Sequence, residues 1–470
     1  MGFFDDMVTA PKIRPALNIG CLFDIPTGVF VKGIHGEWIL NGGDSTTNSL
    51  QGPGNSFKSE IINYMTFTPF SRVSCSKALV YDTENSMTYE RLQRAVDNAM
   101  PSSKIIVDDP NNDRVKLVQS ADILGDQWFD LVKKTGKERI TAKNKEMRKI
   151  QIAGADGKAM EMMPPGLITV DSLTEFKISE TQEKIVDDNA IGESGTRTLF
   201  MSEGLAKTQL ITQLPNLATQ AGFYFFMVAH TGETIDMGGM FAPKPTKMTH
   251  AKSGVKHKGV PQKWTTINNN LYEIFNAKVL YNSGTRFPLY PKDSATNKVE
   301  SADLNIVTLV NVRNKGGQSG FRYELIISQS EGLLVGLTMF HYLKESDRYG
   351  ITGNNTSYHL DLYPECTINR VSVRGKLKED YRLYRATEIT TQLLQMEKLW
   401  PAVKYDPKYR CTPQELYDDI KKLGYDWNVL LDTRGWWCFL EDEKDLKPFL
   451  STMDLLAMRA GEYKPYWLKK

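Results

Sequence analysis

Short apolar runs bounded by polar or turn residues recur along the first two thirds of the chain, with segments of helical length between them. The runs cover residues 37–40, 77–81, 167–170, 223–229 and 306–312. Continuous apolar strands that alternate with helices are typical of a parallel sheet covered on both faces. We therefore expect an α/β fold with a mainly parallel central sheet.

The pattern is interrupted once and then fades. An apparent insertion at about 110–164 contains a basic stretch, 133–149, which is either a solvated helix face or a nucleic-acid contact, and a hairpin is predicted at 151–162 around Asp156-Gly157. From 346 onward the alternation fades and five of the eight tryptophans occur, which favours a second, aromatic core. We predict a short arm at 1–16, a core at 17–345 and a smaller α+β region at 346–470.

Composition narrows the class of protein. Of the 470 residues, 41% are hydrophobic and 24% charged, which excludes wholesale disorder. A formal charge of +2 means that a polyanionic partner must be held by a local basic patch. The five cysteines form no C-x-x-C pair, which argues against a disulfide scaffold or a zinc knuckle. The same cysteine pattern fits a reducing cytosol. Because no stretch approaches 18 apolar residues, and Asp5 and Asp6 stand where a secretory signal would place a positive charge, we expect a protein that neither spans a membrane nor is exported.

Residues 52–59 nearly match a phosphate-binding loop, although residues 44–51 separate this loop from the run at 37–40. In such a loop small residues let backbone N–H groups wrap the phosphates, a Lys neutralises their charge and a hydroxyl binds Mg²⁺. Phe57 replaces the usual Gly, and it fits if its φ is negative and its ring points away from the phosphates. The alternative is a Gly-rich surface turn before a helix. The predicted nucleotide ligands here are Gly52, Gly54, Asn55, Ser56, Phe57, Lys58 and Ser59.

Polar groups follow three of the apolar runs. Glu84, Asp171 and His230 come after the second, third and fourth runs. Ligands of open α/β sheets bind beyond the carboxyl ends of strands, so neighbouring strands would bring these groups to one rim. Beside a Lys-Ser loop they describe a nucleotide hydrolase, in which Asp171 supports the Mg²⁺ bound by Ser59 and Glu84 polarises the attacking water. Ordinary strand-end capping is the plainer alternative for each.

Taken together, the motifs resemble one family. Gly-Pro-x-x-Ser-Phe-Lys-Ser at 52–59, Tyr-Asp-Thr-Glu at 81–84 with Thr88 beyond it, and His-Thr-Gly-Glu-Thr at 230–234 are similar to the UvsX recombinases of tailed bacteriophages, a branch of the RecA family that also carries this Phe. The resemblance covers about residues 17–345. It implies a RecA-like P-loop ATPase that uses ATP and Mg²⁺, forms a filament on single-stranded DNA and promotes strand exchange, in the cytoplasm of the bacterial host.

The resemblance also implies a role for each matching residue. Lys58 and Ser59 would hold phosphates and Mg²⁺, Glu84 would be the catalytic base, Asp171 the acidic Walker B residue, and His230 the switch that links the γ-phosphate to the DNA loop.

Three further candidates lie outside these motifs. Tyr89 is a candidate for stacking on adenine. Arg313 and Lys315, which follow the run at 306–312, look like fingers that reach the nucleotide of a neighbouring protomer, so that hydrolysis depends on assembly. A basic hairpin turn is the alternative for this pair.

A lysine-rich segment, residues 237–264, is the candidate DNA contact. It contains no acidic residue and includes Phe241 and Trp264, on which bases could stack. Its Gly, Pro and Lys content predicts a long loop that does not pack, and a solvated loop is the alternative. The stretch at 182–197 is acidic and receives no site residue. The predicted DNA-binding residues are Lys244, Lys247, Lys252, Lys256, Lys258 and Lys263.

Two other functions remain open from the sequence. A ring-shaped replicative helicase shares the same core, and a DNA-binding scaffold with a degenerate, non-hydrolysing P-loop would share the motifs. We expect self-assembly into a helical filament or a ring, with single-stranded DNA and, during exchange, duplex DNA as partners.

Overall fold

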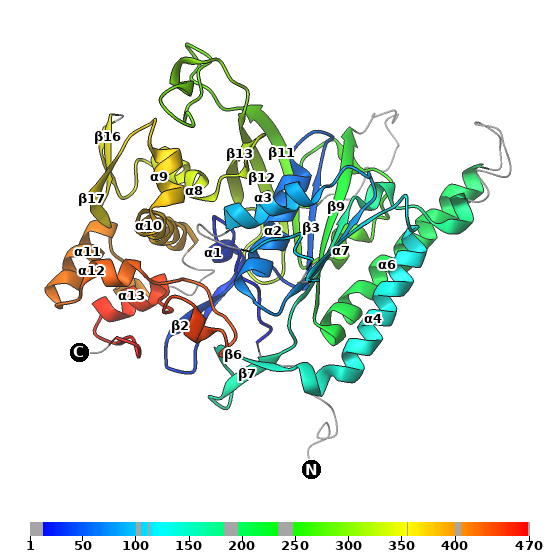
Figure 1. Cartoon of the computed structure of the whole chain (residues 1–470), viewed down its shortest axis with the longest axis horizontal. Helices are drawn as coiled ribbons and strands as arrows, with labels where there is room; N and C mark the ends of the chain where they lie inside the picture. The colour runs from blue at the N-terminus through cyan, green and yellow to red at the C-terminus, as the bar shows by residue number, and fades with distance from the viewer. Residues whose placement is uncertain are drawn as a thin grey trace.

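The fold is built around one twisted central sheet (Figure 1). The computed structural model describes residues 13–99, 105–110, 113–182, 196–233, 248–354, 356–399 and 406–468. Within these residues the sheet has ten strands, in the order β14-β13-β12-β11-β3-β9-β8-β4-β5, with β10 paired to β9. The strands are β3 (Thr47–Gly52), β4 (Lys77–Asp82), β5 (Val115–Gln119), β8 (Gly166–Asp171), β9 (Phe223–Glu233), β10 (Val255–His257), β11 (Asn270–Val279), β12 (Leu304–Asn314), β13 (Arg322–Ser328) and β14 (Gly332–Leu333).

Most of the predicted strands are confirmed, and two are placed differently. The stretch from β11 through β3, β9, β8 and β4 to β5 is parallel throughout. The run at 306–312 lies in β12, which is antiparallel to β11 and not part of the parallel set. The run at 37–40 lies in β2 (Trp38–Asn41), which pairs with β1 (Val29–Lys32) in a separate two-stranded ribbon.

The strand that leads into the phosphate-type loop is β3, which the apolar pattern does not reveal. Its polar side chains are buried and are bonded to neighbouring segments: Ser49 Oγ donates to Asn268 Oδ1 at 2.7 Å, and Asn270 Nδ2 donates to Asn48 Oδ1 at 3.1 Å. Buried polar groups are tolerated when they are paired in this way. The expectation that residues 44–51 merely intervene before the loop is therefore wrong.

Helices cover both faces of the sheet, as the apolar runs predicted. Helices α2 (Lys58–Arg72) and α3 (Tyr89–Ala99) pack on one face, where Leu50, Val80 and Phe226 point toward them. Helices α4 (Gly125–Glu146) and α6 (Thr196–Ala221) pack side by side on the other face (Figure 1).

The apparent insertion is only partly separate from the core. Strand β5 pairs with β4 at the edge of the central sheet, and α4 carries Trp128 and Val132 into the core. The basic stretch at 133–149 lies mainly on the solvent side of α4. The predicted hairpin is confirmed as β6 (Arg148–Ala153) paired with β7 (Ala159–Met162), with Gly157 at a φ of +75°.

The chain after residue 346 forms a smaller α+β region that shares its core with the preceding part. Three predicted core tryptophans, Trp427, Trp436 and Trp437, are buried there. The Trp437 indole N–H donates to the Ala16 carbonyl at 3.0 Å, and the Gln395 side chain donates to the Leu22 carbonyl at 2.8 Å. The elements after the sheet are α8 (Val335–Glu345), β15 (Ile351–Asn354), β16 (Ser357–Leu360), β17 (Tyr363–Ile368), α9 (Val373–Glu379), α10 (Tyr381–Leu399), α11 (Pro413–Lys422), α12 (Trp427–Leu431) and α13 (Thr452–Arg459).

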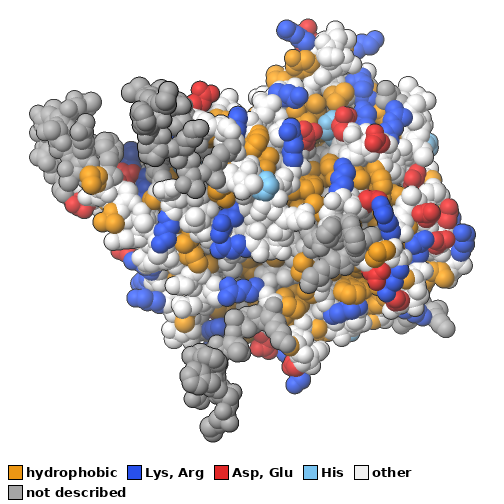
Figure 2. Space-filling view, turned by 180° about the vertical axis from the view of Figure 1, so that it is seen from behind, with side chains coloured by type: hydrophobic (Ala, Val, Ile, Leu, Met, Phe, Trp, Pro, Cys, Tyr) orange, Lys and Arg blue, Asp and Glu red, His pale blue; other side chains and the backbone are white. Residues whose placement is uncertain are grey.

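The surface agrees with the small net charge. On the face drawn in Figure 2, Lys and Arg side chains lie among Asp and Glu side chains. All five cysteines are free. No helix among the described residues is long and apolar enough to cross a membrane. Of the predicted arm, residues 1–12 lie outside the described part of the chain, and residues 13–16 lie against the core of the same chain.

Candidate functional site

The glycine-rich loop connects β3 to α2 at the carboxyl edge of the parallel strands. A side chain at Gly52 would come within 2.9 Å of Ile274 Cβ, so the close approach of β11 requires glycine here. Gly54 faces open space, and Asn55 has a φ of +52°.

Phe57 adopts a left-handed backbone conformation, in contrast to the negative φ expected from its place at the start of a helix. Its φ is +65° and its ψ +22°, in the left-handed region, so the expected negative φ is wrong. For an L-residue this conformation costs about 1–2 kcal/mol. The ring packs against the hydrophobic core between the sheet and α2, and that contact offsets part of the strain. The motif thus keeps the backbone geometry of the usual Gly while adding a side chain.

Lys58 is held inside the loop. Its ammonium donates to the Pro53 carbonyl, which also accepts from Ser56 Oγ at 2.7 Å. Burial lowers the pKa of Lys58, and the nearby Asp171 and Glu84 carboxylates oppose that change. A buried cation at the first residue of α2 provides a charge for anionic phosphate oxygens, next to the free N–H groups of the helix end.

Asp171 ends β8 and is fixed by the neighbouring strand. The Thr83 amide donates to the Asp171 carbonyl at 2.8 Å, and Thr83 Oγ1 exchanges hydrogen bonds with the Ser172 backbone. Burial raises the pKa of Asp171 to about 6, although a hydrogen bond with Ser59 and the charge of Lys58 act in the opposite direction. The Asp171 carboxylate is therefore buried without enough positive charge nearby to compensate it.

That imbalance fits a divalent cation. Mg²⁺ in nucleotide sites is typically bound through one or two protein oxygens together with phosphates and water. The Asp171 carboxylate and the Ser59 hydroxyl are suitable donors of this kind. Among the described residues no cluster of three or more His, Cys, Asp or Glu side chains forms a metal site of its own.

Glu84 and His230 form a pair at the rim. His230 Nε2 lies 2.9 Å from Glu84 Oε1, and Ser172 Oγ donates to the same oxygen at 3.4 Å. About 40% of the Glu84 side chain is exposed, so solvent water reaches it. Because β9, β8 and β4 are adjacent, the sequence prediction that these groups share one rim is confirmed.

These groups line one cavity of about 420 Å³, which also contains residues that the sequence argument missed. Arg91 and Arg94 lie one turn apart on α3, and both approach Glu60 of α2. Arg94 also donates to the Gln329 carbonyl at 3.3 Å. The sequence does contain a signal for these two residues: they are arginines three positions apart in the helical segment that follows Glu84. The lining residues are Asn55, Ser56, Phe57, Lys58, Ser59, Glu60, Glu84, Ser86, Arg91, Arg94, Asp171, His230 and Gln329.

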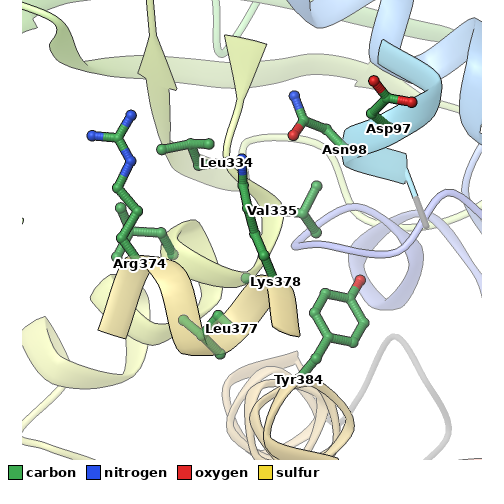
Figure 3. A pocket seen from close by; sticks show the side chains of 10 residues that line it. Asp97, Asn98, Leu334, Val335, Arg374, Leu377, Lys378 and Tyr384 are labelled. Atoms are coloured by element: carbon green, nitrogen blue, oxygen red, sulfur yellow. The ribbon is translucent and has the colours of Figure 1, made fainter. Parts of the chain in front are cut away.

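Tyr89 does not line this cavity. Its hydroxyl accepts a 3.4 Å hydrogen bond from the Leu117 amide of β5, and its ring packs on the core. A separate pocket of about 250 Å³ lies between the end of α3 and helices α8, α9 and α10, with Asn98, Leu377 and Tyr384 in its wall (Figure 3). No residue of the glycine-rich loop lines this second pocket.

Arg313 and Lys315 lie at the amino-terminal end of β3, whereas the glycine-rich loop lies beyond its carboxyl end. Arg313 Nε donates to the Asn268 carbonyl at 2.9 Å, and the Lys315 amide donates to the Asn269 carbonyl at 3.0 Å. Asn269 is level with Thr47, the first residue of β3, whereas the loop follows its last residue. The six residues of β3 therefore separate the two cations from the loop by about 17–20 Å along the strand. Neither cation lines the cavity of its own chain.

The lysine-rich segment is partly folded, contrary to the prediction that it does not pack. Lys256 lies in β10, paired with Gly232 of β9, and Lys252 donates to the Phe275 carbonyl at 3.0 Å. Trp264 is completely buried under α6, so it is a core residue and not a stacking platform. Lys258 and Lys263 lie in the same described part.

Two of the predicted DNA-binding lysines, Lys244 and Lys247, lie outside the described residues, as does Phe241. Comparison with known proteins adds no constraint: no protein-family model matches the chain, and no curated protein matches it.

Proposed function

We propose that the chain is an ATP-dependent DNA recombinase that binds single-stranded DNA and assembles head to tail. The observation that carries the proposal is the convergence of the loop lysine, the buried Asp171 and the Glu84–His230 pair on one cavity beyond adjacent parallel strands. This arrangement offers a cation, a metal-binding carboxylate and a base to a single triphosphate. The resemblance to the UvsX branch of the RecA family supports strand exchange as the purpose of that hydrolysis.

The chain's own residues have separate tasks in this proposal. Lys58 and the loop N–H groups bind the phosphates, and Ser59 with Asp171 would hold Mg²⁺, which supplies further neutralisation of phosphate charge. Glu84 orients a water for in-line attack and takes its proton. His230 positions the Glu84 carboxylate through their 2.9 Å contact.

Assembly would complete the site. Arg313 and Lys315 lie at the amino-terminal end of β3, away from the cavity. They can therefore contact only the nucleotide of a neighbouring copy whose loop faces this end of the sheet. A repeated contact between two different surfaces of the same protein extends into a helical filament or closes into a ring. Positive charge brought to the transferring phosphoryl group stabilises the transition state, which makes turnover depend on the neighbour.

Steady-state ATP turnover with and without single-stranded DNA tests the proposal. We expect DNA-stimulated hydrolysis that Lys58→Ala abolishes and that Lys77→Ala, a matched exposed lysine at the start of β4, leaves unchanged. Nucleotide binding without hydrolysis in the wild type would instead favour a non-hydrolysing scaffold. Negative-stain images with ATP and single-stranded DNA separate the remaining alternatives: extended helices support the recombinase, and closed hexamers indicate a ring helicase.

A further inference from the structure

A compact set of hydrogen bonds ties the Glu84–His230 pair to the base of the lysine-rich segment, and Thr174 is at its centre. Thr174 lies in the short helical turn after β8. Its hydroxyl accepts from the His230 amide at 2.8 Å and donates to the Lys258 carbonyl at 3.1 Å. The Lys258 amide in turn donates to the His230 carbonyl at 2.9 Å.

A buried lysine from α6 closes the same set. Lys207 is 1% exposed, and its ammonium donates to the carbonyls of Thr174 and Gly259, each at 3.0 Å. Glu203, one helical turn earlier, balances the charge at 2.7 Å. We refer to Thr174, Lys207, His230 and Lys258 as the Thr174 junction.

The Thr174 junction joins segments that the proposed function assigns to different ligands. The His230 imidazole contacts Glu84 at the cavity, and Lys258 belongs to the candidate DNA segment. Lys207 belongs to α6, which packs on the face of the sheet opposite α2 and α3. Because Thr174 is bonded to the backbone amide of His230, a shift of the His230 backbone toward or away from the cavity must move the Thr174 hydroxyl or break its bond. Direct hydrogen bonds through a single hydroxyl are a physical connection, unlike mere proximity.

We infer that Thr174 is the positioning residue that couples nucleotide binding to single-stranded-DNA binding, with Lys207 fixing its carbonyl. The inference rests on the proposed function and adds to it the route of communication. Thr174 does not line the cavity, so removing its hydroxyl leaves the side chains that would contact the nucleotide in place. Coupling between two ligands is reciprocal and typically amounts to about 5- to 150-fold in affinity.

The test measures the affinity for a fluorescent oligo-dT with and without a non-hydrolysable ATP analogue, and the affinity for the analogue with and without oligo-dT. Thr174→Val removes both hydroxyl bonds at nearly constant volume, and we expect the coupling factor to fall about tenfold while each separate affinity stays within about twofold. Thr174→Ser keeps the hydroxyl and should restore coupling. Lys207→Met should reproduce the loss, and Thr212→Val, whose hydroxyl bonds to its own helix, is the matched control.

The outcomes separate the inference from the proposed function. If Thr174→Val keeps wild-type coupling, or weakens nucleotide binding in the absence of DNA, the positioning role is wrong. If the wild type hydrolyses ATP but shows no coupling, the inference fails and the ATPase remains. If the wild type binds neither ligand, the proposed function fails first, and the inference fails with it. Hydrogen exchange at the Lys258 amide gives a second readout, which should rise in Thr174→Val when the analogue is bound.

Discussion

Replacing Asp171 by Asn should stabilise the protein in the absence of nucleotide while destroying its use of Mg²⁺. Burial raises the pKa of this carboxyl from 3.8 to about 6. The folded state therefore binds the proton more tightly than the unfolded state, and stability falls as pH rises between about 4 and 6. Above pH 6 the charged form destabilises the fold by about 3 kcal/mol, a cost that the neutral amide does not carry.

Urea unfolding of both proteins at several pH values, without divalent cations, measures this effect. We expect the variant to be more stable by up to about 3 kcal/mol at pH 7.5, and the difference to shrink through about 1 kcal/mol near pH 4.5 toward zero below about pH 4. Other buried carboxyls, such as Asp454, whose pKa is raised to about 7, titrate in both proteins and cancel. Added Mg²⁺ and ATP should stabilise only the wild type. Equal stability of the two proteins throughout this range would refute the assignment of Asp171 as an uncompensated buried carboxylate.

Four further predictions test single residues. Glu84→Gln should lower phosphate release about 10²- to 10⁴-fold with unchanged nucleotide affinity, and wild-type turnover would remove Glu84 as the base. Arg313→Ala should abolish DNA-stimulated turnover yet bind nucleotide; mixing it with Glu84→Gln should restore part of the activity, whereas no recovery argues against action between protomers. Phe57→Gly should exceed Phe57→Ala in unfolding free energy by about 1 kcal/mol, because only Ala keeps the left-handed strain, and equal values contradict the strained φ. Trp264→Ala should lower the free energy of unfolding by about 3–5 kcal/mol. Unchanged stability with lost DNA affinity would instead show that the Trp264 ring stacks on a DNA base.

The parallel sheet and its rim could be predicted because their signals are local. Apolar runs mark β4, β8 and β9, and the polar residue that follows each run needs only the common direction of the strands to reach its neighbours. Strand β3 could not be found in this way. Its Asn48 and Ser49 are buried because asparagines on the β11 side supply their partners from more than 200 residues away, and no local pattern reports that pairing.

The remaining errors have the same origin. Side chains avoid the left-handed region, which favours a negative φ at Phe57, yet a ring that reaches the core can offset such strain. The Lys, Gln and Pro neighbours of Trp264 indicate an unpacked loop, although its side chain packs in the core with residues of α6. In each case a tertiary contact outweighs the local preference.

The packing of the C-terminal region on residues 16–22 has a consequence for synthesis. The Ala16 carbonyl is met by an indole 421 positions later. At about 5–20 residues per second, roughly 20–80 s pass on the ribosome between the two. Until then Leu17, Ile19 and Leu22 lack the C-terminal side chains that they pack against in the complete fold. The nascent chain therefore exposes these apolar side chains, which a chaperone would be suited to bind.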